Sequence, residues 1–94
     1  MSKKLELTLA SGPYESVRAL SDGTVTADGI ELNLLTDMDP GTRHARMLKH
    51  REFDIAEVSM SSYLMTADRD RAFCAIPVFL HRRFRHGFIF INTT

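Results

Sequence analysis

Alternating hydrophobic and polar residues predict two strands near the start of the chain, with a helix between them. Leucines alternate with polar residues over residues 4–10, and apolar residues alternate with polar ones again over residues 30–34. Residues 14–21 instead carry apolar side chains at helical spacing, including Val17 and Leu20. Gly23 follows this segment and suits a left-handed cap, so we expect the helix to end there.

The middle of the chain predicts two more helices, each with a capping residue at its start. The pair Asp39-Pro40 is typical of the N-cap and first turn of a helix, and a short strand is expected over residues 53–58. Ser59 then suits the N-cap of a helix over residues 60–67. Four residues of that last helix are expected to form its buried stripe: Met60, Tyr63, Leu64 and Met65.

Two apolar runs near the end of the chain predict further strands. Residues 73–79 are rich in β-prone side chains, and residues 88–91 are continuously apolar, as in a strand buried on both faces. Strands that alternate with helices indicate an α/β fold, with a largely parallel sheet and flanking helices. Such a sheet usually continues with a helix, so we expect residues 1–94 to form a single incomplete lobe at the N-terminus of a longer protein.

Three segments are expected to meet at one rim of this sheet. Ligands of parallel α/β sheets bind beyond the carboxyl ends of the strands, which here are residues 11–14, 57–62 and 79–86. The rim that these segments form is therefore the expected binding site.

Composition excludes several classes of protein. The chain has 12 basic and 12 acidic residues, and this balance argues against a general nucleic-acid binder. Its single cysteine, Cys74, excludes an internal disulfide and a zinc site with several cysteines, and we expect no metal site. No apolar run approaches the ~20 residues of a membrane span, and the N-terminus lacks the apolar region of a signal peptide. We therefore expect a cytoplasmic protein that does not bind membranes.

The charges are unevenly distributed along the chain. All 12 acidic residues lie at or before Asp70, whereas four arginines and no acidic residue follow it. Arg82, Arg83 and Arg85 lie on the expected rim, where guanidinium groups can hold carboxylates in a bidentate way. The alternative is a solvated loop that offsets the acidic remainder of the chain.

Other rim residues also allow two interpretations each. Ser59, Ser61 and Ser62 place three hydroxyls at a helix N-terminus, which suits an anion, or Ser59 alone caps the helix. Glu57 is a candidate general acid or base, or it pairs with an arginine. His86 is a candidate proton carrier, or it is a hydrogen-bonded residue that anchors its loop.

Two longer segments resemble the 4,5-dihydroxyphthalate decarboxylase family. They are residues 52–64 (EFDIAEVSMSSYL) and residues 75–79 (AIPVF), the latter followed by the basic run at residues 82–86 (RRFRH). A third match joins the Asp-Gly pair at residues 22–23 to residues 28–32. The resemblance covers nearly the whole chain in the right order.

The resemblance implies a fold and a set of ligand-binding residues. The family is similar to type 2 periplasmic solute-binding proteins, in which two α/β lobes enclose a cleft, so this chain would supply only part of lobe 1. Tyr14 and Arg18 match the ends of a family motif after the first strand, whereas its basic and threonine positions are lost. The family usually carries apolar residues where Arg43 and His44 stand, so we expect weaker packing of that helix.

The resemblance also implies a reaction, the decarboxylation of an aromatic dicarboxylate such as 4,5-dihydroxyphthalate. Arginines of the rim would hold the carboxylates, and His86 and Glu57 would move protons. No organic cofactor is required. The expected partners are a small aromatic carboxylate, the second lobe and possible further copies of the chain.

Two other functions stay open at this point. One is a non-catalytic solute-binding lobe of an ABC-transporter-type binding protein that recognises a small carboxylate. Such a lobe would need the same arginines and serines without a proton donor. The other is a stand-alone structural or interaction domain. The missing signal peptide favours the enzyme over a periplasmic receptor.

Overall fold

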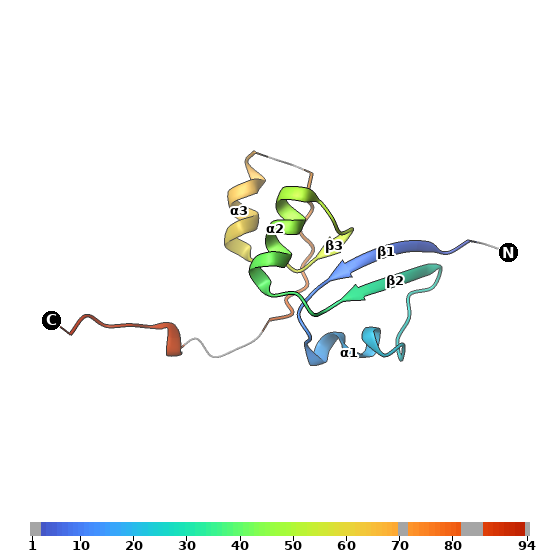
Figure 1. Cartoon of the computed structure of the whole chain (residues 1–94), viewed down its shortest axis with the longest axis horizontal. Coiled ribbons are helices and arrows are strands. Elements are labelled where there is room, and N and C mark those ends of the chain that lie inside the picture. The colour runs from blue at the N-terminus through green and yellow to red at the C-terminus, as the bar shows by residue number, and fades with distance from the viewer. Residues whose placement is uncertain (1–2, 70–71, 82–85, 94) are drawn as a thin grey trace.

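A three-stranded parallel sheet forms the centre of the computed structural model, which describes residues 3–69, 72–81 and 86–93. The strands are β1 (Leu5–Ala10), β2 (Ile30–Leu35) and β3 (Ile55–Ala56), in the order β2-β1-β3 (Figure 1). The prediction of an α/β chain with a parallel sheet is therefore confirmed. The two-lobed arrangement stays a prediction.

The register of the strands places leucines opposite leucines. Leu7 pairs with Leu32 and Leu9 with Leu34 along the full length of β1 and β2. β3 pairs with β1 only through Leu9–Ile55 and Ala10–Ala56, so the predicted strand at residues 53–58 is much shorter than expected. All three strands run in the same direction, so their carboxyl ends lie at one edge of the sheet.

A side chain continues the pairing where β3 is absent. The backbone N–H of Thr8 donates to Asp54 Oδ2 at 2.8 Å, and the N–H of Asp54 donates to the Thr8 carbonyl at 3.1 Å. The Asp54 carboxylate therefore takes the place that a backbone carbonyl has in a strand ladder.

The three predicted helices are present, and the second and third begin at their predicted caps. They are α1 (Glu15–Ser21), α2 (Pro40–His50) and α3 (Met60–Ala67). Asp39 Oδ2 accepts from the N–H of Thr42 at 2.9 Å, and Ser59 Oγ accepts from the N–H of Ser62 at 3.2 Å. After α1, Gly23 has a φ of 82°, the left-handed conformation predicted for it. Figure 1 shows α1 on one side of the strands and the α2–α3 pair on the other.

The buried core is small. Ala10, Val17 and Phe53 are its buried hydrophobic residues, and they lie in β1, in α1 and just before β3. Ser11 and Arg43 are buried beside them. Polar residues therefore make up a large share of the buried residues in the described chain.

The predicted buried stripe of α3 is wrong at three of its four positions. Met60, Leu64 and Met65 are exposed, with 75% of Met65 accessible, and only Tyr63 is partly covered. The apolar spacing correctly identified a hydrophobic face of α3, which would be stabilised by packing against another element. Within the described residues, however, α3 has a packing partner in α2 and no layer over this face.

The two predicted strands near the end of the chain are also wrong in this structure. Residues 72–81 contain no strand, and residues 86–93 contain only a short 3₁₀-helix, η1 (His86–Phe88). Phe88, Ile89, Phe90 and Ile91 are exposed, Phe90 by 86%. Figure 1 shows residues 86–93 leading away from the sheet, so the apolar run has no strand to pair with here. In the described part of the chain, no helix has the length and apolar content to cross a bilayer.

We expect the 94-residue chain to self-associate, because residues 88–91 and α3 expose apolar side chains to water. Phe90→Lys should raise the fraction of monomer measured by multi-angle light scattering at equal protein concentration. Val25→Lys is the matched control, since Val25 is also exposed but stands between two threonines. A wild-type chain that is monodisperse and monomeric at ~100 μM, in the micromolar-to-millimolar range where exposed apolar surface promotes association, would contradict this expectation.

Candidate functional site

Backbone hydrogen bonds bring two of the predicted rim segments together. The N–H of Ser11 donates to the Leu35 carbonyl at 3.0 Å, and the N–H of Glu57 donates to the Ala10 carbonyl at 2.8 Å. The chain leaving β1 therefore lies between the residues that follow β2 and β3. Because of this, side chains from residues 11–14 can reach Glu57.

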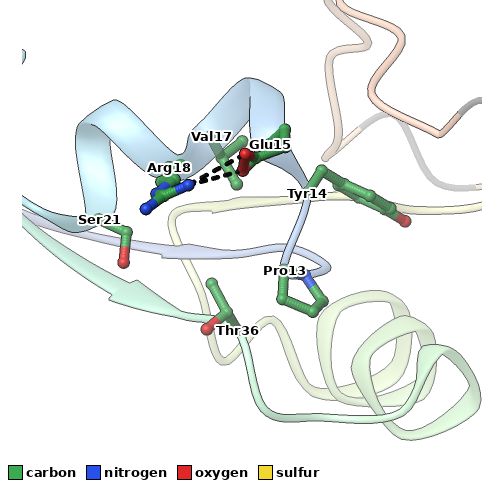
Figure 2. Close-up of a pocket in the computed structure, with 7 residues that line it drawn as sticks. All are labelled: Pro13, Tyr14, Glu15, Val17, Arg18, Ser21 and Thr36. Carbon is green, nitrogen blue, oxygen red and sulfur yellow. Dashed lines mark hydrogen bonds and ion pairs between the residues drawn. The ribbon is translucent and has the colours of Figure 1, made fainter.

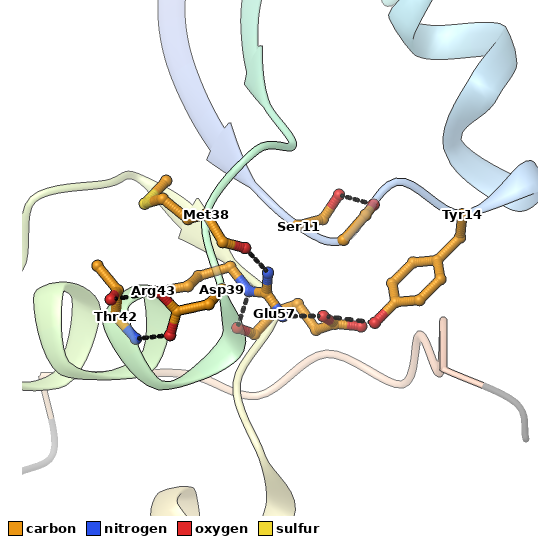
Figure 3. Close-up of polar contacts among 8 residues, drawn as sticks. Ser11, Tyr14, Met38, Asp39, Thr42, Arg43 and Glu57 are labelled. Atoms are coloured by element: carbon orange, nitrogen blue, oxygen red, sulfur yellow. Dashed lines mark hydrogen bonds and ion pairs between the residues drawn. The ribbon is translucent and has the colours of Figure 1, made fainter.

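A buried ion pair between Arg43 and Glu57 is the centre of the site (Figure 3). Arg43 Nη2 lies 2.5 Å from Glu57 Oε1, and the two side chains are only 2% and 15% exposed. Arg43 Nε also donates to the Glu57 carbonyl at 3.3 Å, and Nη1 donates to the Met38 carbonyl at 3.3 Å. One guanidinium from α2 thus fixes both the side chain and the backbone of Glu57.

Tyr14 joins the same carboxylate from the other side. Its hydroxyl donates to Glu57 Oε1 at 2.9 Å, and Figure 3 shows the ring reaching from the segment after β1 toward Glu57. Burial raises the pKa of the Tyr14 phenol, and the hydrogen bond to Glu57 raises it further. His81 stacks on the Tyr14 ring with the centroids 5.7 Å apart and the planes at 26°. Tyr14 therefore stays a neutral hydrogen-bond donor up to high pH.

The second oxygen of Glu57 is enclosed without a partner. Among the described residues, no hydrogen-bond partner reaches Oε2, although this atom is buried. Glu57 thus adopts the structural alternative expected for it, an ion pair with an arginine. Its role as a general acid or base stays a prediction.

The three serines interact mainly with one another. Ser59 Oγ donates to Ser62 Oγ at 2.7 Å and lies 3.5 Å from Ser61 Oγ, while it also caps α3. Capping by Ser59 is therefore confirmed. Anion binding by this helix start stays a prediction.

An open pocket of about 220 Å³ lies beside α1, on the other side of the segment that carries Tyr14 (Figure 2). Arg18 lines it and pairs with Glu15 at 3.1 Å, and the Arg18 side chain is 71% exposed. Figure 2 shows the Tyr14 ring directed away from this ion pair. Tyr14 and Arg18 both line the pocket, but the Tyr14 hydroxyl points away from Arg18 and binds Glu57. The pocket is lined by Pro13, Tyr14, Glu15, Val17, Arg18, Ser21 and Thr36.

Four predicted site residues come from the end of the chain, namely Arg82, Arg83, Arg85 and His86. Arg82, Arg83 and Arg85 lie outside the described residues. His86 is exposed at the start of η1, and residues 86–93 lead away from the sheet, so the structure does not bring His86 to Glu57. Within residues 3–69, 72–81 and 86–93, no group of three His, Cys, Asp or Glu side chains is placed to hold a metal ion.

Arg43 is the site residue that sequence reasoning missed. The sequence shows a basic residue where the resembled family is apolar, and this predicted weaker packing of the helix. Instead, Arg43 is buried and satisfied by three hydrogen bonds. The neighbouring His44 is half-buried, and its pKa is lowered by burial and by the charge of Arg43. The sequence did carry a signal for this pair. Arg43 stands in a helix with few apolar residues, and the acidic Glu57 follows the next strand.

Comparison with known proteins confirms the resemblance. The chain is 40% identical over 90 residues to a 4,5-dihydroxyphthalate decarboxylase of Pseudomonas putida, covering 95% of this chain and 34% of that protein. It is 37% identical over 90 residues to a 4,5-dihydroxyphthalate decarboxylase of Comamonas testosteroni, covering 95% of this chain and 27% of that protein. The match thus spans only 27–34% of the length of these curated relatives. It matches no protein-family model.

We expect Arg43→Met to destabilise the fold by about 3 kcal/mol, because it leaves the buried Glu57 carboxylate without its counter-charge. Chemical denaturation measures this change. Adding Glu57→Gln should restore part of the loss, since the remaining group is then uncharged. The matched control Arg18→Met removes an exposed ion pair and should change the free energy of unfolding by less than about 1 kcal/mol. Equal effects of the two arginine substitutions would show that the buried pair does not stabilise the fold.

Proposed function

We propose that this chain forms part of an enzyme that decarboxylates an aromatic dicarboxylate of the 4,5-dihydroxyphthalate type. The observation that carries the proposal is the match over 95% of the chain to two proteins that bear this activity in their names. The proposal extends to the two-lobed arrangement, in which this α/β unit supplies one wall of a cleft. The alternative of a non-catalytic solute-binding lobe is not favoured, since neither relative is named as a binding protein.

The reaction needs proton transfer and charge stabilisation, and no organic cofactor enters its electron flow. Each carboxylate of 4,5-dihydroxyphthalate is para to a hydroxyl. Removing the proton of that hydroxyl and adding a proton to the ring carbon that bears the carboxylate gives a dienone. The carbon–carboxylate bond then breaks, carbon dioxide leaves, and its electron pair returns the ring to an aromatic phenolate. Protonation of the phenolate gives a catechol with one carboxylate. A general base and a general acid therefore suffice, with cations for the two carboxylates.

The described cluster supports a specific division of roles. The Arg43 guanidinium and the Tyr14 hydroxyl both bind Glu57 Oε1, which orients Glu57 Oε2 at the end of β3. We assign Glu57 to proton transfer after the cleft rearranges to admit substrate, because Oε2 is enclosed in the present arrangement. His86 would carry the second proton, and Arg82, Arg83 and Arg85 would hold the carboxylates. Ser59, Ser61 and Ser62, together with Arg18, would contribute further polar contacts to the substrate.

A hybrid enzyme tests the proposal. The matched segment of the Pseudomonas putida decarboxylase is replaced by the 90 matched residues of this chain, and carbon dioxide release from 4,5-dihydroxyphthalate is measured. We expect the hybrid to be active. The 94-residue chain alone should release no carbon dioxide, because one wall of a cleft neither orients substrate nor excludes water.

Substitution of Glu57 in the hybrid tests its chemistry. Glu57→Gln should lower kcat by at least about 100-fold, the scale of a lost general acid or base. Glu52→Gln is the matched control, because Glu52 pairs with Arg46 in a more exposed position and should leave kcat nearly unchanged. An inactive hybrid that folds with native-like circular dichroism would contradict the proposed activity for this chain.

We also expect the basic run to bind the carboxylates of the substrate. In the hybrid, Arg85→Ala should weaken the binding of a phthalate-type ligand by about 2–5 kcal/mol, as measured by calorimetry, if the contact is desolvated in the closed cleft. The control is Arg69→Ala, which removes an exposed arginine just after α3. Unchanged affinity in the Arg85 variant would exclude this role.

A further inference from the structure

Gly12 lies directly beneath the hydroxyl end of the Tyr14 ring. A Cβ atom built on Gly12 would lie 2.6 Å from Tyr14 Cζ and 2.8 Å from the Tyr14 hydroxyl oxygen. Such distances are far inside van der Waals contact, so a side chain of any size at this position displaces the ring. The ring therefore occupies the volume that a side chain of residue 12 would need.

The backbone conformation of Gly12 does not explain why glycine stands there. Gly23 and Gly29 have positive φ angles, whereas Gly12 is not among the positive-φ residues. Any residue can adopt backbone angles outside the left-handed region. The need for glycine at this position is therefore one of space.

The loop around Gly12 cannot easily move away to make room. Gly12 and Ser11 are both buried, and Ser11 Oγ donates to the Gly12 carbonyl at 3.0 Å (Figure 3). That carbonyl also accepts from the N–H of Tyr14 at 3.0 Å, and the N–H of Ser11 is held by the Leu35 carbonyl. A clash at Gly12 would therefore move the Tyr14 side chain and not the backbone.

We propose that Gly12 is a positioning residue, whose missing side chain lets the Tyr14 hydroxyl reach Glu57 and fix its carboxylate. Two groups then set the position of Glu57 Oε1, namely Arg43 from α2 and Tyr14 from the segment after β1. The consequence for decarboxylation rests on the proposed function, in which Glu57 moves a proton.

The Tyr14 phenol itself reports on this contact. Among the described residues, the charged or titratable groups that face the phenol and its ring are Glu57, Arg43 and His81. Burial and the contact with Glu57 raise the pKa of Tyr14, while Arg43 opposes this change. Displacing the hydroxyl toward water should therefore bring its pKa down toward the ordinary value for tyrosine.

The first experiment follows the two tyrosines of the chain by NMR of ¹³Cζ-labelled tyrosine during a pH titration, with Tyr14→Phe for assignment. In Gly12→Ala, the Tyr14 signal should titrate at lower pH than in the wild type, while Tyr63 stays unchanged. Gly87→Ala is the matched control, because a Cβ there meets no atom within 4 Å. An unchanged Tyr14 titration in Gly12→Ala overturns the proposal.

A second experiment keeps the proposal testable if Gly12→Ala folds poorly. Thermal unfolding is compared for Gly12→Ala, Tyr14→Ala and the double variant. In the presence of Tyr14, we expect Gly12→Ala to lower Tm by roughly 5 °C or more. In the Tyr14→Ala background, where the ring no longer fills the space beside residue 12, Gly12→Ala should have little effect on Tm. An equal loss in both backgrounds shows that the Tyr14 ring is not what requires glycine, and it overturns the proposal.

The hybrid enzyme separates this proposal from the proposed function. If the hybrid is active, Gly12→Ala should lower kcat by about 10-fold or more with a smaller change in KM, because a misplaced catalytic group slows the chemical step. A shifted Tyr14 titration in a hybrid without activity would support the positioning role and contradict the proposed function. A shifted titration with an unchanged kcat would limit Gly12 to a structural role and overturn its role in positioning for the reaction.

Discussion

The charge pair between Arg43 and Glu57 connects parts of the chain that the hydrophobic core does not. Only Ala10, Val17 and Phe53 form the buried apolar core of the described residues, too few to hold α2 firmly against the end of β3. Arg43 instead binds the backbone of Met38 and both the backbone and side chain of Glu57. The orientation of α2 relative to the rim thus depends on directional hydrogen bonds. A charge this well enclosed is tolerated only because each side of the guanidinium has an acceptor.

The Arg43–Glu57 pair also sets the orientation of the carboxylate at the rim. Glu57 is held at one oxygen by Arg43 and Tyr14, and the Tyr14 ring in turn lies against Gly12 and stacks with the His81 ring. Three segments that are distant in sequence, around Tyr14, Arg43 and His81, therefore influence the one carboxylate of Glu57. Such convergence gives a fixed orientation to a group that would otherwise sample several rotamers, and this is what a proton-transfer site needs.

Features that depend on local chemistry could be predicted from the sequence. The caps Asp39 and Ser59 and the left-handed Gly23 were predicted because each residue interacts with its own neighbours within three or four positions. The parallel direction of the strands followed from the alternation of strands and helices. The burial of α3 and of residues 88–91 could not be predicted in the same way. An apolar face shows that cover is needed, but not which segment provides it. Arg43 was missed because its partner lies 14 residues further along the chain, on another element.

The Asp54 contact with Thr8 gives the sheet an unequal pair of edges. On the β3 side, the pairing of β1 begins with the Thr8–Asp54 contact and continues across the two residues of β3, so it covers only the last three residues of β1. On the other side, β2 is an edge strand of six residues. A further strand would therefore find more backbone to pair with at β2 than at β3. On the side that carries the Arg43–Glu57 pair, β3 offers only two residues for pairing, and the longer template for backbone pairing lies along β2.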